Sequence, residues 1–303
     1  MNNLSTLITE TRNKKSMNID NMSTNDIIHT INNEDMVVAK KVQEVLPSVE
    51  ATVDITYNAL KQGGRLFYVG AGTSGRIGVL DAVECPPTFS TSSDMVQAVI
   101  AGGGGAFQKA AEGAEDNPGL GEEDLKERHL SKLDVVIGIA ASGRTPYVLG
   151  ALQYAQELGA KTISLTSNEH SEISKYADVK IEVVTGPEVL TGSTRMKAAT
   201  AHKMILNMIT TASMIKVGKV YENLMVDLKV SNNKLKERAK GILSTITEMP
   251  YEKSEAVLES TGYKVKPAIV MIKAETTYKN AVKSLSEAGG LVRQAIKIAR
   301  EMN

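Results

Sequence analysis

The stretch GRLFYVGAGTSGRIGVL, residues 64–80, predicts the fold of this chain. It joins a short apolar run to a Gly/Ser/Thr loop and then to an apparent helix. A second stretch, LDVVIGIAASGRT at 133–145, repeats the same order. A helix that begins after such a loop presents backbone N–H groups and a dipole that favour an anion. Two such loops on neighbouring parallel strands predict one phosphate held from two sides.

The residues that we expect around this phosphate carry hydroxyl groups or no side chain at all: Gly72, Thr73, Ser74, Ser142, Gly143 and Thr145. The first loop also matches the dinucleotide fingerprint G-x-G-x-x-G. That fingerprint requires an acidic residue at the end of the second strand. Asp94 instead lies before the run at 96–103, and glycines follow it. The sequence therefore favours phosphate over NAD, and a tight turn without ligand remains the structural alternative.

Composition limits the possible partners and compartment. The 303 residues suffice for one large α/β domain or two smaller ones, and 35 basic residues balance 35 acidic ones. We therefore expect neither nucleic acid nor membrane as a partner. A single cysteine, Cys85, excludes an intrachain disulfide and is expected to be a small buried residue. The first residues lack the apolar core of a signal peptide, which indicates the cytoplasm.

The pattern along the chain predicts an α/β protein. A polar arm over 1–32 precedes an expected long helix at 34–61. Strands are expected at 65–70, 96–101, 134–140, 161–166 and 179–184. Helices are expected at 75–84, 106–115, 145–158, 171–177 and 194–217. Such alternation predicts a parallel sheet with helices on both faces and a ligand at the carboxyl ends of its strands.

The last part of the chain is charged and without strand signals. It predicts short helices at 252–260, 265–273, 277–287 and 291–300, with Gly262 and Gly289 as C-caps. We expect three parts: 1–50 as the arm and the start of the long helix, 51–232 as the sheet domain, and 240–303 as a small helical domain.

Carboxylates are the candidates for chemistry. The four histidines show no metal-ligand spacing, so no metal or other cofactor is expected. Glu84 ends the helix expected after the first loop, and Glu115 lies in the next βα unit. Ten residues of helix place Glu84 roughly 15 Å from Ser74. Both groups can act on one ligand only if the chain bends or a second subunit completes the site. A surface or capping acid is the alternative for Glu84.

Six long segments resemble the N-acetylmuramic acid 6-phosphate etherases: TETRNKKS (9–16), GRLFYVGAGTSGRIGVLDAVECPPTF (64–89), EGAEDN (112–117), DVVIGIAASGRTPYVLGALQYA (134–155), GPEVLTGSTRMKAATAHKMILNMI (186–209) and GKVYENLMVDLKVSNNKL (218–235). The resemblance runs nearly end to end, with a weaker match over 90–107. It implies the sugar isomerase (SIS) fold, a five-stranded parallel sheet between helices in an αβα sandwich, with a small C-terminal helical domain. It also implies a cytoplasmic homodimer that recycles cell-wall sugars.

By this resemblance, Glu84 in VECPP and Glu115 in EGAED form the acid–base pair. We expect Glu84 to protonate the leaving ether and Glu115 to remove the proton at C2, although the reverse assignment uses the same groups. Glu188, Ser193 and Lys197 lie in a segment that faces the ligand in related phosphosugar proteins. Lys197 opposes the dipole of its expected helix, and an ordinary exposed lysine is the alternative.

The implied reaction releases D-lactate from C3 of N-acetylmuramic acid 6-phosphate and leaves N-acetylglucosamine 6-phosphate. Two other functions remain open at this point. A phosphosugar aldose–ketose isomerase would use the same fold without the VECPP and EGAED strings. A regulator that binds the phosphosugar without turning it over, as the glucokinase regulatory protein does, would not need both carboxylates.

Overall fold

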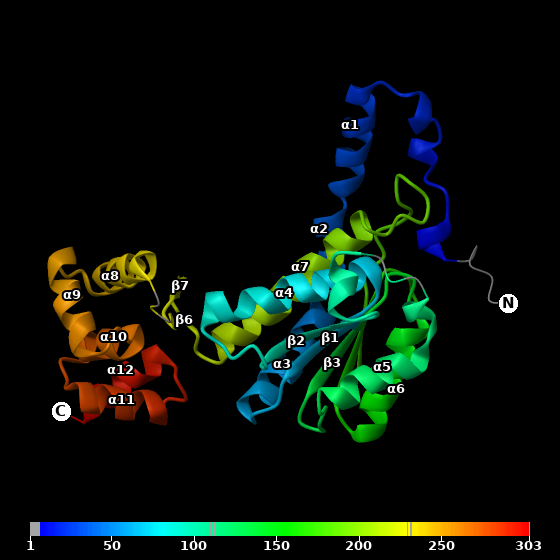
Figure 1. Ribbon diagram of the computed structural model, residues 1–303. Coiled ribbons are helices and arrows are strands. Elements are labelled where there is room, and N and C mark those ends of the chain that lie inside the picture. Colours follow the sequence, from blue (N-terminus) through cyan, green and yellow to red (C-terminus); the bar gives the residue numbers. More distant parts are fainter. Residues whose placement is uncertain (1–6, 110, 112, 229, 231, 303) are drawn as a thin grey trace. The chain divides into compact units, whose positions relative to one another are not determined.

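The computed structural model describes residues 7–109, 111, 113–228, 230 and 232–302. The chain forms two compact units. Met1–Val83 and Ser93–Thr210 make the first, and Glu84–Ser92 and Thr211–Asn303 make the second. The first unit is α/β, and the second consists mainly of helices (Figure 1). Among the described helices, none combines the length and the apolar character that crossing a membrane requires.

A parallel five-stranded sheet forms the centre of the first unit. Its strands are β1 (Leu66–Gly70), β2 (Val96–Ile100), β3 (Val135–Ile139), β4 (Lys161–Thr166) and β5 (Val179–Glu182). Their spatial order is β2-β1-β3-β4-β5, and every neighbouring pair is parallel. The five strands expected from the sequence are confirmed. Because the chain moves outward from β1 in one direction and from β3 in the other, the strand order reverses between these two strands.

Helices cover both faces of the sheet (Figure 1). On one face, α5 (Pro118–Glu127) and α6 (Pro146–Leu158) lie side by side, and buried Tyr147 and Leu152 pack with Phe67 of β1. On the other face lie α3 (Leu46–Lys61), α4 (Gly72–Phe89) and α7 (Lys197–Lys216). There the Tyr68 hydroxyl donates a 2.8 Å hydrogen bond to Asp81 of α4. The αβα sandwich implied by the resemblance is confirmed.

Helices α2 (Val38–Glu44) and α3 replace the single long helix expected at 34–61, and α1 (Thr24–Asp35) precedes them. Pro47 stands in the first turn of α3. A proline there has no N–H to donate to the preceding turn, so the hydrogen bonds of α2 do not continue into α3. The apolar spacing that predicted one helix crosses these breaks, because it records burial and not continuity of the backbone.

The segment between β2 and α5 also differs from expectation. A helix at 106–115 was expected, but the described residues form two short 3-10 turns, η5 (Gly104–Phe107) and η6 (Ala114–Asp116). Gly103 and Gly113 have positive φ angles of 71° and 83°, which end regular helix. The regular helix is α5, which begins after the N-cap Asn117. The helix expected at 171–177 is likewise one short turn, η7 (Ile173–Tyr176).

Helix α4 is longer than the sequence indicated. It was expected to end at Glu84, yet it continues through Pro86 and Pro87 to Phe89. A proline inside a helix removes one backbone hydrogen bond, so contacts outside the helix must stabilise this last turn. Residues Glu84–Ser92 belong to the second unit, which supplies such contacts. Cys85 is buried in this turn, as expected for a small apolar residue.

The N-terminal arm lies against other residues of the sheet unit. It contains η2 (Ile8–Glu10), η3 (Lys14–Ser16), η4 (Ile19–Asn21) and α1, whose N-cap is Ser23. The Ser16 hydroxyl donates to the carbonyl of Val189, and the N–H of Gly192 donates to the carbonyl of Thr9. Hydrogen bonds therefore join the arm to the segment after β5.

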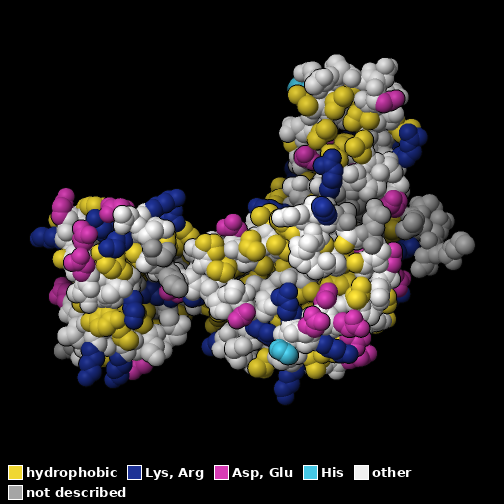
Figure 2. Space-filling view, viewed as in Figure 1, with side chains coloured by type: hydrophobic (Ala, Val, Ile, Leu, Met, Phe, Trp, Pro, Cys, Tyr) yellow, Lys and Arg dark blue, Asp and Glu magenta, His cyan; other side chains and the backbone are white. Residues whose placement is uncertain are grey.

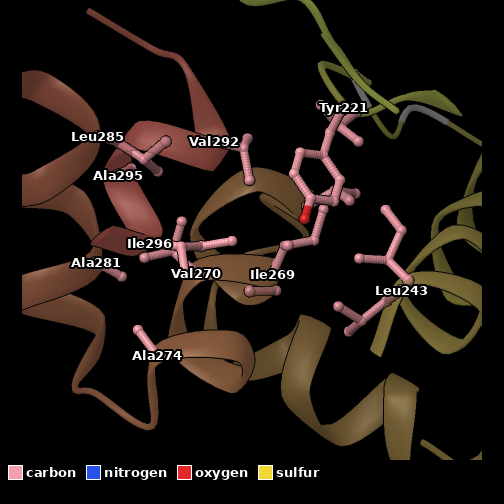
Figure 3. Packing of buried hydrophobic residues seen from close by; sticks show 14 of the residues in the cluster. Tyr221, Leu243, Ile269, Val270, Ala274, Ala281, Leu285, Val292, Ala295 and Ile296 are labelled. Carbon is pink, nitrogen blue, oxygen red and sulfur yellow. The ribbon is translucent and has the colours of Figure 1, made fainter. Parts of the chain in front are cut away.

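The second unit begins with a short hairpin of β6 (Val220–Tyr221) and β7 (Leu224–Met225). Its helices are α8 (Asn233–Thr247), α9 (Tyr251–Ser260), α10 (Val265–Ala274), α11 (Tyr278–Glu287) and α12 (Val292–Glu301). The last four were expected individually, and α8 lies in the part of the chain expected to be helical, whereas the hairpin was missed. Gly262 and Gly289 follow helix ends with φ of 59°, as expected for C-caps. Figure 3 shows the core, in which the Tyr221 ring lies near Ile269.

Candidate functional site

The two hydroxyl-bearing loops lie at the same edge of the sheet. β1 and β3 are parallel neighbours, and their last residues, Gly70 and Ile139, are paired in register. The loops that follow them therefore leave the sheet next to each other, where the strand order reverses. In open α/β sheets, ligands bind in the crevice at such a reversal, outside the carboxyl ends of the strands.

The glycines of the first loop allow α4 to approach β1 closely. A Cβ on Gly75 would lie 2.7 Å from the carbonyl oxygen of Gly70, and a Cβ on Gly70 would lie 2.7 Å from the Gly75 nitrogen. Gly72 starts α4 with a φ of 54°. This packing explains the G-x-G-x-x-G pattern without a dinucleotide. Thr73 and Ser74 then stand in the first turn of α4, where backbone N–H groups lack partners within the helix.

The second loop also depends on a glycine. Gly143 has a φ of 69°, and a Cβ there would lie 2.2 Å from the Cβ of Ser171. Ser142 Oγ accepts a 3.3 Å hydrogen bond from the N–H of Arg144, and Thr145 is the N-cap residue of α6. The hydroxyls of Thr73, Ser74 and Thr145 make no hydrogen bond to another described residue, so they remain able to bind an anion.

Arg144 was not singled out from the sequence. Its Nη1 atom is buried and has no hydrogen-bond partner among the described residues. A buried guanidinium nitrogen without a partner is costly unless an acceptor arrives. An anionic ligand at the second loop would supply that acceptor. The signal was a basic residue inside a Gly/Ser/Thr loop, which composition alone does not distinguish from a surface residue.

The third segment predicted to face the ligand is held from within the protein. Both carboxylate oxygens of Glu188 accept backbone N–H groups at the start of α7, from Lys197 at 3.0 Å and Ala198 at 2.9 Å. Burial raises the pKa of Glu188 although these bonds lower it. The amine of Lys197 lies 2.6 Å from Glu34, with 3% of the side chain exposed. The interpretation of Lys197 as an exposed lysine is wrong. Ser193 is half-buried.

Glu34, at the end of α1, is the centre of this contact. Its carboxylate also accepts bonds from Lys15 at 2.9 Å and Asn13 at 2.7 Å. Burial alone would raise its pKa, but the bonds from Lys15, Lys197 and Asn13 outweigh burial and hold the pKa at about 2. The arm therefore fixes the beginning of α7. No sequence pattern pairs residues so far apart in the chain.

Two further buried residues, Asn168 and His202, make hydrogen bonds near the second loop. The Asn168 side chain donates to the carbonyl of Ala141 in the second loop and accepts from the N–H of Ile8 in the arm. His202 Nε2 lies 3.0 Å from the Ser167 hydroxyl, and burial lowers its pKa to about 4, so the ring is neutral near pH 7. Within the described ranges, no three His, Cys, Asp or Glu side chains gather to hold a metal ion.

The structure places the two candidate carboxylates on different elements. Glu115 is exposed on η6, which packs against α6, the helix that begins at the second loop. Glu84 is exposed on α4 and belongs to the second unit. Helix α4 is continuous from Ser74 to Glu84, so the expected separation of roughly 15 Å holds along its axis. One copy of α4 therefore does not bring Ser74 and Glu84 to the same phosphate.

Family models match most of the chain. The glucokinase regulatory protein N-terminal SIS domain matches residues 38–156, and the SIS domain matches residues 119–212. The C-terminal lid domain of glucokinase regulatory protein matches residues 222–295, which contain α8 to α11 and the start of α12. The SIS fold and the small C-terminal helical part expected from the sequence are confirmed.

Curated relatives match over nearly their whole length. The chain is 58% identical over 295 residues to the N-acetylmuramic acid 6-phosphate etherase of Bacillus subtilis (strain 168), covering 97% of both chains. It is 53% identical over 294 residues to the enzyme of the same name from Clostridioides difficile (strain 630), again covering 97% of both. Because the match covers 97% of each relative, no large segment of either relative is unmatched.

Proposed function

The chain belongs to the N-acetylmuramic acid 6-phosphate etherase family, and we propose that it converts N-acetylmuramic acid 6-phosphate to N-acetylglucosamine 6-phosphate and D-lactate. As an enzyme it is a carbon–oxygen lyase. The observation that carries the proposal is the meeting of two hydroxyl-bearing loops at the carboxyl ends of β1 and β3. Such a crevice fits the 6-phosphate of the substrate.

The 6-phosphate binds between these loops. Thr73 and Ser74 contribute hydroxyls and the helix N-terminus of α4, and Ser142 and Thr145 contribute those of α6. Gly72 and Gly143 leave room for the ligand to approach the backbone. The segment that contains Glu188, Ser193 and Lys197 lines the substrate. The Glu188 and Lys197 side chains are bound within the protein, so they act by shaping this segment.

The reaction follows from the open-chain form of the sugar. Its C1 aldehyde acidifies the proton on C2, and Glu115 removes that proton as the base. Glu84 protonates the ether oxygen at C3, the C3–O bond breaks, and D-lactate leaves with both electrons of that bond. Water then adds at C3, and the proton returns to C2. Each proton transfer contributes about 10²- to 10⁴-fold to the rate.

We propose that the two carboxylates meet through a homodimer. Since Glu84 lies roughly 15 Å along α4 from Ser74, it serves a phosphate held by the second copy. Exposed apolar side chains support an association: Met17, Ile28 and Met36 of the arm are 46%, 56% and 62% exposed. Figure 2 shows hydrophobic side chains gathered on the arm. Soluble monomers seldom expose such clusters.

Two alternatives fit less well. The family models for the glucokinase regulatory protein would suit a regulator that binds a phosphosugar. A regulator would not need two carboxylates at Glu84 and Glu115, and an aldose–ketose isomerase would not need the strings around them. Relatives that match over 97% of the chain carry the etherase name. We place the enzyme in the cytoplasm, in the recycling of cell-wall sugars.

One assay tests the function. Purified protein is incubated with N-acetylmuramic acid 6-phosphate, and released D-lactate is measured. Binding without release would support the regulator. The same reaction in deuterated water tests the mechanism, because the product must carry deuterium at C2. A product without deuterium at C2 would show that the proposed proton removal does not occur.

A further inference from the structure

The end of α4 that carries Glu84 lines a cavity within the second unit. The cavity has a volume of about 390 Å³. Its walls are Pro86 and Pro87 from the last turn of α4, Leu228, Asn232 at the N-cap of α8, and Lys234, Leu235 and Arg238 from α8. All of these residues belong to the same compact unit. None of the hydroxyl-loop residues proposed to bind the phosphate lines this cavity.

The cavity combines an apolar wall with two cations. Lys234 and Arg238 are four residues apart on α8 and therefore share one face of the helix. Neither forms an ion pair with a described carboxylate. Glu237, the acid beside Arg238, is bonded to Lys240 and Tyr251 instead. None of the lining residues is acidic. The cavity is therefore suited to a small anion that also has an apolar part.

The location of the cavity relates it to the reaction. Glu84 precedes Pro87 by three residues on α4, so both lie on one face of the helix, one turn apart. A ligand against Pro87 is within one helical turn of the carboxylate that acts on the leaving ether. The lactyl group is such a ligand. It has a carboxylate, a methyl group and the ether oxygen on a single carbon.

We propose that this cavity binds the lactyl carboxylate of the substrate and, after cleavage, D-lactate. The inference rests on the proposed etherase function. Arg238 and Lys234 bind the carboxylate, because a guanidinium matches a carboxylate with two parallel hydrogen bonds. Pro87 and Leu228 contact the methyl group. The ether oxygen is attached to the same carbon as the carboxylate and the methyl group. Binding of these two groups therefore positions the ether oxygen beside Glu84 for proton transfer.

The test uses the double variant Lys234→Gln/Arg238→Gln in the full-length protein. Both side chains are exposed, so the variant is expected to fold, which its circular dichroism melt checks. We expect its KM for N-acetylmuramic acid 6-phosphate to rise about tenfold or more, because charge-assisted hydrogen bonds are lost. The inhibition constant of N-acetylglucosamine 6-phosphate, which lacks the lactyl group, stays unchanged. Calorimetric binding of D-lactate disappears. Lys253→Gln, at an exposed position of α9, is the matched control. It should change neither the KM nor the binding of D-lactate.

Two results would overturn the proposal. Either KM and D-lactate binding stay at the wild-type values, or KM and the inhibition constant of N-acetylglucosamine 6-phosphate rise together. The second result would mean that the cations bind the phosphate. If the wild type releases no lactate at all, the proposed function fails, yet D-lactate calorimetry still decides. Binding lost in the double variant supports the cavity, whereas no binding, or equal binding in both proteins, refutes it.

Discussion

The two ends of α4 are built by different parts of the molecule. At Gly72–Gly75 the helix lies against β1 so closely that a Cβ on Gly75 would be 2.7 Å from a backbone oxygen. At Glu84–Phe89 the same helix contains two prolines and belongs to the helical second unit. The first end is fixed by steric contact within the sheet unit. The second is fixed by contacts from residues far along the chain.

In the proposed mechanism the two ends of α4 have different tasks. Close packing of Gly70 against Gly75 fixes the start of α4, where we propose that N–H groups and hydroxyls bind the phosphate. The other end carries an exposed carboxylate, Glu84, and the apolar wall of the cavity lined by Arg238. The proposed phosphate binding and bond cleavage therefore depend on separate contacts, and substitutions can affect one without the other.

The largest expected effect is on the chemistry at the second end. Glu84→Gln keeps the size of an exposed side chain but cannot give up a proton as an acid. We expect lactate release to fall by about 10²- to 10⁴-fold, with the free energy of unfolding unchanged. Stopped lactate assays and urea denaturation measure the two quantities. Full activity in this variant would remove Glu84 from the reaction.

At the first end, the expected effect is on stability. Gly75→Ala places a methyl group 2.7 Å from the Gly70 oxygen and 2.6 Å from Ile100 Cγ1. Helix and strand must separate, which costs about 1–3 kcal/mol. Urea denaturation measures this loss, and substrate KM should rise with it. Gly241→Ala in α8 is the control: nothing lies within 4 Å of its Cβ. It should stabilise by about 0.5–1 kcal/mol. Equal effects of both substitutions would contradict the comparison.

The two ends of α4 also differ in how well the sequence predicts them. The β1 and β3 loops were predictable because their signals are local: an apolar run, a glycine that permits a positive φ, and hydroxyls at a helix start. The continuation of α4 past Pro86 was not predictable from the sequence. Local preferences end a helix before a proline, and only contacts with the second unit stabilise this turn. Glu84 was identified through a family motif, and its placement in the second unit had no local signal.

The arm adds a third way of fixing a site segment, by buried charge. Glu34 contacts Lys197 at the start of α7 across 163 positions of sequence, and its pKa is held at about 2. Because the folded pKa lies below the ordinary value of 4.5, its contribution to stability is complete above about pH 4.5 and is lost as the pH falls towards 2.

Glu34→Gln should therefore destabilise the protein by about 2–3 kcal/mol at pH 7. The difference from the wild type should shrink as the pH is lowered from 4.5 through about 2, because the wild-type carboxylate becomes protonated over this range. Urea denaturation of both proteins at several pH values measures it. A difference that stays constant with pH would show that the ion pairs of Glu34 do not contribute to stability.

The smallest expected effect comes from removing a single hydroxyl group from either of the two loops. Ser74→Ala and Thr145→Ala each remove one hydroxyl without disturbing a described hydrogen bond. Each should cost about 1 kcal/mol of binding, a rise in KM of about fivefold, with kcat unchanged. Inorganic phosphate should inhibit both variants more weakly than the wild type. Thr200→Ala, which removes an exposed hydroxyl of α7, serves as the control. If only one loop variant weakens phosphate inhibition, the phosphate is not held from both sides, and the strand reversal between β1 and β3 is not its binding site.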